Sequence, residues 1–205
     1  MILPILYLRM KTNPLTIINE LFTPISANVL LLGDDQAKII IVEFADYQCE
    51  ACVKFHKEIK GALIEKFVKT GKVKFLFKDL IVNDSPNNEA STLAASASYC
   101  AAEQGKYWEY NDELYTNSQG ENIGWATKDN LKQFASNIGI ANIVQFSDCI
   151  ESDKYYNLVN ENDAFAKNIG LTTAPTFIFY NGTTPVAIQG MHQYNSFEQI
   201  INEIS

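Results

Sequence analysis

Two cysteines separated by two residues are the feature of this sequence best suited to chemistry. Cys49 and Cys52 form a Cys-x-x-Cys motif, and thiols at this spacing can cycle between a dithiol and a disulfide. The motif alone also resembles half of a zinc site, and His56 extends it to Cys-x-x-Cys-x-x-x-His. A fourth ligand is missing nearby, because His192 is distant in sequence. We therefore expect no metal site and interpret His56 as a surface histidine on a helix.

The residues around the motif indicate which elements position it. An apolar, β-branched run from Ile39 to Phe44 predicts a strand, and apolar residues at four-residue intervals predict a helix from the motif to about Gly71. The cysteines thus lie where a strand gives way to a helix. The unpaired N–H groups at a helix N-terminus favour thiolate over thiol. We expect Cys49 to be the exposed, activated nucleophile and Cys52 to be the shielded resolving thiol.

Strand patterns recur on both sides of a long helical region. Residues 72–80 alternate in the manner of a strand. A hairpin is predicted from residues 176–180 and 185–190, which are joined by the turn dipeptide Asn181-Gly182. Asn195 or Ser196 is expected to cap a last helix.

The order of these patterns predicts an α/β protein that carries an insertion. We assign residues 37–86 and 171–205 to the α/β domain, residues 87–170 to an inserted all-helical subdomain, and residues 1–36 to an N-terminal segment. Within the insertion, helices are predicted at 90–102, 108–115, 127–139, 144–152 and 155–169.

The N-terminal segment permits several interpretations. Residues 1–8 are apolar but too short to span a bilayer, and Arg9 and Lys11 follow the apolar run rather than precede it. The run is the stub of a trimmed export signal, a weak anchor or an ordinary packed segment. Pro14 predicts a short helix over residues 15–22.

Composition and charge exclude one class of function. The chain has 205 residues, of which 47% are hydrophobic, enough for one sizeable core. Its formal net charge is −8, and no Lys/Arg cluster is present that could follow a phosphate backbone. We therefore expect no nucleic-acid partner.

The other two cysteines stand alone in sequence. In an oxidising compartment, Cys100 and Cys149 would form a structural disulfide that contributes a few kcal/mol. The alternative is two buried free thiols, which are common in protein cores. The sequence leaves both open, and we favour the disulfide.

Three local motifs resemble those of a known family. They are the strand and turn from Val42 to Cys52, the segment from Tyr99 to Tyr110, and the loop from Gly170 to Phe177. Together with the order of elements, they resemble the thioredoxin fold in its DsbA-like form, over roughly Leu32 to Ser205. The resemblance implies a thioredoxin fold with an inserted all-helical subdomain and the activity of a thiol–disulfide oxidoreductase.

The resemblance also implies roles for residues outside the motif. Pro175 should be cis and face the Cys49 sulfur, with a trans proline opening an edge strand as the alternative. Ala174 stands where the family often has Thr or Val, which alters the surroundings of the thiolate. Glu43 resembles the family's buried acid, which accepts the proton of Cys52. We expect Lys78 to be its partner; the alternative is that both are solvated strand charges.

The redox centre requires no cofactor beyond the Cys49–Cys52 disulfide itself. Glu50 adds negative charge near the thiolate and Ala51 adds no cation, so both should raise the Cys49 pKa. We therefore expect an oxidant weaker than the most oxidising relatives.

The resemblance further implies the protein's surroundings. It implies an extracytoplasmic location, with or without a membrane anchor. The expected substrates are reduced or unfolded polypeptides, and the expected partner is a membrane thiol oxidase that restores the disulfide. The protein is expected to be a monomer. A disulfide reductase or isomerase is the alternative activity. A non-catalytic zinc-binding or chaperone module is the alternative from another class.

Overall fold

A mixed β-sheet is the element on which the rest of the chain packs. The computed structural model describes residues 30–183 and 185–205, and these form a five-stranded sheet of order β1-β3-β2-β4-β5. β2 runs parallel to β3 and antiparallel to β4. All seven residues of β2 are buried, so this strand lies in the core. The strands are β1 (Leu31–Leu32), β2 (Ile39–Ala45), β3 (Val73–Asp79), β4 (Thr176–Tyr180) and β5 (Val186–Gln189).

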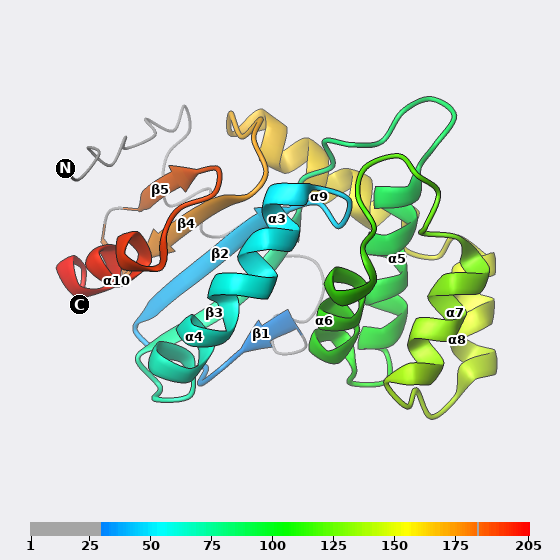
Figure 1. Cartoon of the computed structure of the whole chain (residues 1–205). Coiled ribbons are helices and arrows are strands. Elements are labelled where there is room, and N and C mark those ends of the chain that lie inside the picture. Colours follow the sequence, from blue (N-terminus) through cyan, green and yellow to red (C-terminus); the bar gives the residue numbers. More distant parts are fainter. Residues whose placement is uncertain (1–29, 184) are drawn as a thin grey trace.

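One face of the sheet is covered by two helical segments (Figure 1). The first runs without interruption from the Cys-x-x-Cys motif and contains two π-helical stretches. Its apolar side chains and those of the last helix pack on odd-numbered β2 residues such as Ile39 and Ile41. The segments are α3 (Glu50–Phe55), η1 (His56–Lys60), α4 (Gly61–Leu63) and η2 (Ile64–Val68), followed at the end of the chain by α10 (Tyr194–Glu203).

The other face packs against helices that are inserted between β3 and β4. Even-numbered strand residues, including Val42, Phe44 and Leu76, share a hydrophobic cluster with them. α5 is buried along nearly its whole length because its Ala and Ser side chains allow close approach of its neighbours. The inserted helices are α5 (Ala90–Ala102), α6 (Tyr107–Asn117), α7 (Lys128–Asn137), α8 (Ile143–Glu151) and α9 (Tyr156–Asn168).

The structure departs from the sequence-based boundaries at two places. β1 lies within the segment 1–36 that we set apart, and its main chain pairs with the edge of β3. α10 begins at Tyr194 after an extended Gln193, rather than after a capping Asn195 or Ser196. The expectations for residues 1–8 and 15–22 lie outside the described residues.

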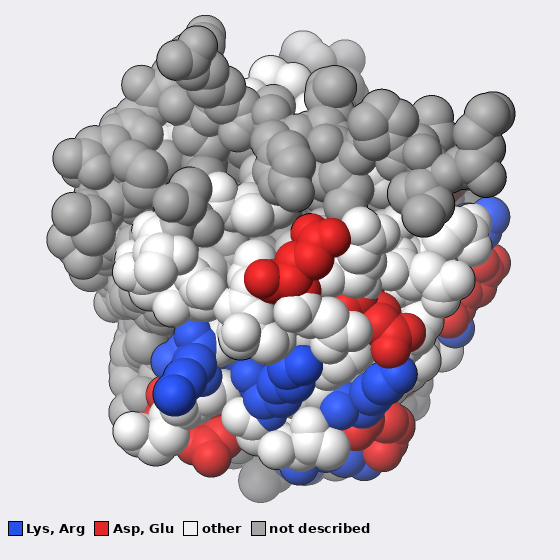
Figure 2. Space-filling view, turned by 90° about the vertical axis from the view of Figure 1, so that its left-hand side faces the viewer, with Lys and Arg blue, Asp and Glu red and all other residues white. Residues whose placement is uncertain are grey.

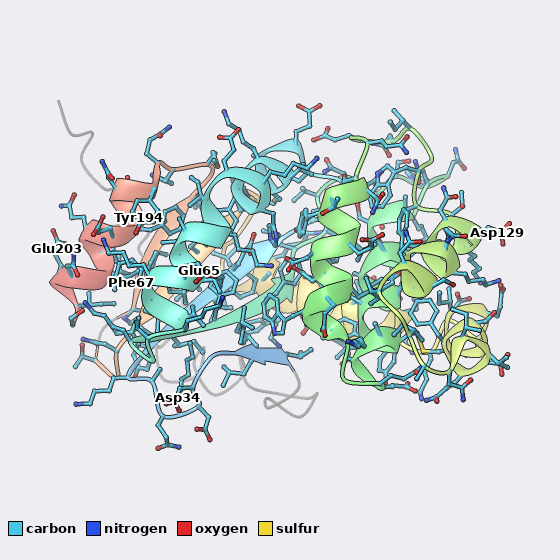
Figure 3. The ribbon with its side chains drawn as sticks, turned by 60° about the horizontal axis from the view of Figure 1, so that its bottom comes forward. Asp34, Glu65, Phe67, Asp129, Tyr194 and Glu203 are labelled. Atoms are coloured by element: carbon cyan, nitrogen blue, oxygen red, sulfur yellow. A yellow bond between two sulfur atoms is a disulfide. The ribbon has the colours of Figure 1, made fainter. Side chains whose placement is uncertain are left out.

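One side of the molecule carries side chains of both charges. Figure 2 shows acidic and basic side chains interspersed on the side of the molecule that faces the viewer. Ion pairs such as Lys66–Glu198 account for part of this mixture by joining η2 to α10. Phe67 of η2 and Tyr194 of α10 lie at one end of the molecule, whereas Asp129 of α7 lies at the opposite end (Figure 3). Within residues 30–183 and 185–205, no helix combines the length and apolar character needed to cross a membrane.

Candidate active site

Cys49 occupies the junction between β2 and α3. It is the N-cap residue of α3, and its carbonyl oxygen accepts the first helical hydrogen bond from Val53 N at 3.0 Å. Both Cys49 and Cys52 are free thiols. Cys49 was expected to be exposed, but only 7% of its surface is accessible, against 0% for Cys52. The proline loop that approaches Cys49 accounts for this, and the order of accessibility of the two thiols is as expected.

The two thiols have opposite electrostatic environments. The pKa of Cys49 is lowered, first by a hydrogen bond from the Cys52 thiol and also by the N–H groups of Cys52 and Ala51, while burial and the Asp46 carboxylate oppose this. Burial raises the pKa of Cys52 well above its ordinary value, and the hydrogen bond to Cys49 adds to the increase. Cys49 is therefore the better nucleophile and leaving group, and Cys52 is a thiol that resists ionisation.

The loop before β4 contacts the Cys49 sulfur. The Ala174–Pro175 peptide bond is cis, and Cys49 Sγ donates to the Ala174 carbonyl oxygen at 3.5 Å. Gly190 N donates to the Pro175 carbonyl oxygen at 2.7 Å, which holds this loop against the end of β5. The structure thus brings together residues that are 125 positions apart.

Glu43 is buried behind the thiols and contacts His56. None of its surface is exposed, and both carboxylate oxygens lie 3.1 Å from His56 Nε2. Burial raises the Glu43 pKa to about 8, although the Lys60 charge opposes the increase. His56 is not the surface histidine that we expected: its side chain is 3% exposed. Its ring stacks on Tyr115 with the ring centroids 3.6 Å apart, which explains the burial.

Lys78 is not the hydrogen-bond partner of Glu43. In the parallel pairing of β2 and β3, Glu43 lies opposite Phe77, and Lys78 lies opposite Phe44. Because paired residues point to the same face of a sheet, Lys78 belongs to the face that packs on the helical subdomain. There Lys78 Nζ donates to Asn162 Oδ1 at 3.1 Å. The prediction of a Glu43–Lys78 pair was therefore wrong.

Comparison with known proteins places this arrangement in a family. A family model described as Thioredoxin matches residues 26–203. The chain belongs to the thioredoxin family. The "Probable disulfide bond formation protein D" of Bacillus cereus is 27% identical over 154 residues, which are 74% of this chain and 69% of that protein. The disulfide bond formation protein D of Bacillus subtilis is 23% identical over 175 residues, 84% of this chain and 75% of that protein.

Solved structures establish the fold of this thioredoxin-family chain. Wolbachia pipientis alpha-DsbA1 superimposes with a TM-score of 0.76 at 24% identity, covering 91% of this chain and 94% of that chain. The chain has a thioredoxin fold with an inserted helical subdomain, as the sequence predicted.

The inserted subdomain of this thioredoxin-family protein holds the second cysteine pair. Cys100 of α5 and Cys149 of α8 are joined by a disulfide that closes a loop of 49 residues. The alternative of two free thiols at these positions is therefore wrong. Among the described residues, no group of three or more His, Cys, Asp and Glu side chains is arranged to hold a metal ion.

Sequence reasoning missed two side chains that fix the loops around the site. Asp46 Oδ2 accepts from Val82 N and Asn83 N, both at 2.9 Å. Gln48 donates to Ser91 Oγ at 2.8 Å and accepts from Asn122 N at 2.9 Å. Both side chains are fully buried. The only signal in the sequence is that polar residues follow a strand directly, a pattern typical of any turn.

Proposed function

We propose that this protein is a protein disulfide oxidoreductase that introduces disulfides into exported polypeptides by dithiol–disulfide exchange. The observation that carries the proposal is the asymmetric thiol pair. Cys49 has a lowered pKa and contacts the loop of Pro175, while Cys52 is buried and has a raised pKa. The names of the Bacillus relatives support the same activity.

The mechanism starts from the oxidised pair. A substrate thiolate attacks Cys49 Sγ, the Cys49–Cys52 bond breaks, and a mixed disulfide forms between the substrate and Cys49. Cys52 leaves as a thiolate and takes up a proton. A second substrate thiolate attacks the substrate sulfur of the mixed disulfide, which releases Cys49 as a thiolate and leaves one new disulfide in the substrate. The stabilised Cys49 thiolate favours this last step.

Glu43 is the group proposed to supply the proton to Cys52. Its negative charge raises the Cys52 pKa, so the two groups are close enough to interact. With a pKa of about 8, the carboxyl is mostly protonated at neutral pH and can act as an acid toward the departing thiolate. In the reverse direction the carboxylate accepts the Cys52 proton, the role that the family resemblance implies.

The surroundings of the site suit an extended polypeptide. Two of the exposed large apolar side chains, Val82 at 39% and Ile123 at 61% exposure, lie in the loops that Asp46 and Gln48 hold beside the motif. Exposed apolar side chains near a reactive centre favour contact with unfolded chains, which present apolar residues. Reduced, unfolded polypeptides are therefore the proposed substrates.

The proposed chemistry also implies a cellular setting. Dithiol oxidation requires an oxidising compartment and a partner that restores the disulfide; we propose an extracytoplasmic location and a membrane thiol oxidase. Buried Asp46 opposes the Cys49 thiolate directly, which supports an oxidant weaker than the most oxidising relatives. Glu50 and Ala51 do not act as expected: Glu50 is exposed, so solvent screens its charge, and the N–H group of Ala51 lowers the Cys49 pKa. A reductase or isomerase is the alternative, and a zinc-binding or chaperone module is the alternative from another class.

Oxidative refolding of a reduced ribonuclease tests the proposal. The protein, with a glutathione buffer to reoxidise it, should accelerate recovery of ribonuclease activity, and Cys49→Ser should abolish the acceleration. A double variant, Cys100→Ala with Cys149→Ala, is the matched control because it removes the other cysteine pair. Bound zinc is measured on the same preparation. Stoichiometric zinc with no refolding activity would contradict the proposal and support the module.

A further inference from the structure

The proton donor proposed for Cys52 has no direct route to solvent. Glu43 is 0% exposed, yet each exchange of the Cys49–Cys52 pair adds or removes a proton behind the motif. A buried carboxyl can act repeatedly only if another group returns its proton. The group in hydrogen-bond contact with both Glu43 oxygens, at 3.1 Å, is His56 through Nε2.

His56 also lines a cavity. The cavity has a volume of about 410 Å³, and Lys60, Asp112 and Tyr115 contribute to its walls together with His56. Nδ1 of His56 is buried and has no hydrogen-bond partner among the described residues. An orphaned buried nitrogen is unusual and calls for an explanation. The ring thus has one nitrogen on Glu43 and a second one unengaged, in a side chain that borders open space.

The helix is irregular at this point. Residues His56–Lys60 form the π-helical stretch η1, and π-helical turns within α-helices are frequent at functional sites. Lys60 Nζ donates to Asn111 Oδ1 at 3.0 Å and pairs with Asp112 at 2.5 Å. The stretch therefore presents His56 and a buried cation to the same cavity.

We propose that His56 carries protons between Glu43 and this cavity, and so sets the rate at which Cys52 gains and loses its proton. The proposal rests on the proposed function, because it extends the role given to Glu43. His56 does not touch the reacting sulfurs; it is a positioning and proton-transfer residue that acts through Glu43.

The proton count closes over one redox cycle. When Glu43 has given its proton to Cys52, Nε2–H of His56 passes a proton to the carboxylate, and the buried Nδ1 takes one from a water molecule that enters from the cavity when the side chains covering this nitrogen move. When the pair is reoxidised, Glu43 returns a proton to Nε2 and Nδ1–H releases one to water. Glu43 then accepts the Cys52 proton. The transfer that follows reduction leaves the ring proton on Nδ1, and the transfer on reoxidation restores it to Nε2. The ring therefore starts each cycle in the same tautomer.

The charges around the ring suit transfer through a neutral imidazole. Burial lowers the His56 pKa well below its ordinary value, and the Lys60 charge adds to this effect. The ionisable groups facing the Glu43–His56 pair are the thiols of Cys49 and Cys52, the ammonium of Lys60, the carboxylate of Asp112 and the phenol of Tyr115. A ring that remains neutral can relay a proton by exchanging the position of its N–H, without a stable imidazolium.

The test measures thiol exchange with small molecules. Reduction of the oxidised protein by dithiothreitol and its reoxidation by glutathione disulfide are followed by acid quench, alkylation and mass spectrometry. His56→Ala should slow both steps about 10-fold or more at neutral pH, within the range of general acid–base effects, and should leave the equilibrium constant with glutathione unchanged. His192→Ala, at the only other histidine of the chain, should behave as the parent.

Chemical rescue separates proton transfer from packing. Added imidazole should restore the rate of His56→Ala, whereas 1-methylimidazole, which has a similar shape but cannot pass a proton through both nitrogens, should not. His56→Gln keeps a donor for Glu43 and serves if the alanine variant fails to fold; it should be as slow as His56→Ala. Parental rates in His56→Gln, or equal rescue by both azoles, would overturn the proposal. Failure of the proposed function is a different result: the parent would exchange with dithiothreitol but not refold ribonuclease.

Discussion

The Glu43→Gln variant should gain stability relative to the parent as pH rises from about 4.5 to about 8. Gln has nearly the same shape as Glu, but it stays neutral. In the parent, the folded state holds a proton on Glu43 over this pH range while the unfolded state has released it. Stability therefore falls with pH wherever the folded state binds more protons. Below the pKa of Glu43 in the unfolded state, both states hold the proton, and the parent loses no stability.

The magnitude follows from the two pKa values. The Glu43 pKa rises from 4.5 to about 8, a shift of about 3.5 units, because the carboxyl is buried. Each unit corresponds to 1.36 kcal/mol, so the parent should lose about 5 kcal/mol relative to the Gln variant between these limits. Above the folded pKa both states are ionised, and the difference becomes constant.

Urea unfolding at a series of pH values measures this difference. Both proteins carry Cys49→Ser and Cys52→Ser, which prevents oxidation and removes the titration of the thiols. The difference in unfolding free energy between the Gln variant and the parent should be smallest near pH 4 and should rise by up to 1.36 kcal/mol per pH unit. A difference that stays level from pH 4 to pH 9 would show that Glu43 titrates near its ordinary pKa, and would refute the argument from burial.

Three further stability effects are expected in urea unfolding. Replacing both Cys100 and Cys149 by Ala should lower the unfolding free energy by about 4 kcal/mol, since the lost bridge closes a loop of 49 residues; an unchanged midpoint would contradict this. Tyr99→Phe should cost about 1–3 kcal/mol, because it removes the hydroxyl that donates to the buried Asp79 carboxylate at 2.5 Å. Thr127→Ala should cost about 1 kcal/mol through loss of the side-chain cap of α7; a loss below a few tenths would show that the cap is dispensable.

Local patterns predicted most of the elements because local preference and packing agree there. The Ala-rich run predicted a helix over 90–102, the bounds of α5, and β4 matches the predicted 176–180. The helix predicted over 127–139 corresponds to α7, whose N-cap residue Thr127 accepts a hydrogen bond from Asn130 N through its side chain. The end of a strand followed by Cys-x-x-Cys likewise predicted the position of Cys49 at a helix N-terminus.

The partner of Glu43 could not be predicted from the sequence. It depends on the register of the strands and on contacts between helices, and a single sequence contains neither. Side chains alternate along a strand, so Glu43 and Phe44 point to opposite faces of the sheet, but only the pairing of β2 with β3 shows that Lys78 shares the Phe44 face. His56 follows the core residue Phe55 in a helix, where a polar residue is usually solvated. Its burial arises from stacking on Tyr115, a contact between helices that are far apart in the sequence.

The most direct test of the central claim is a stoichiometric disulfide transfer without oxygen. The oxidised protein is mixed with an equimolar reduced peptide that contains two cysteines, and free thiols are then alkylated and assigned to positions by mass spectrometry. We predict that the peptide gains one disulfide while Cys49 and Cys52 become alkylated and the Cys100–Cys149 bridge is retained. A peptide that stays reduced, or a transfer that opens Cys100–Cys149 while leaving Cys49 and Cys52 joined, would contradict the account.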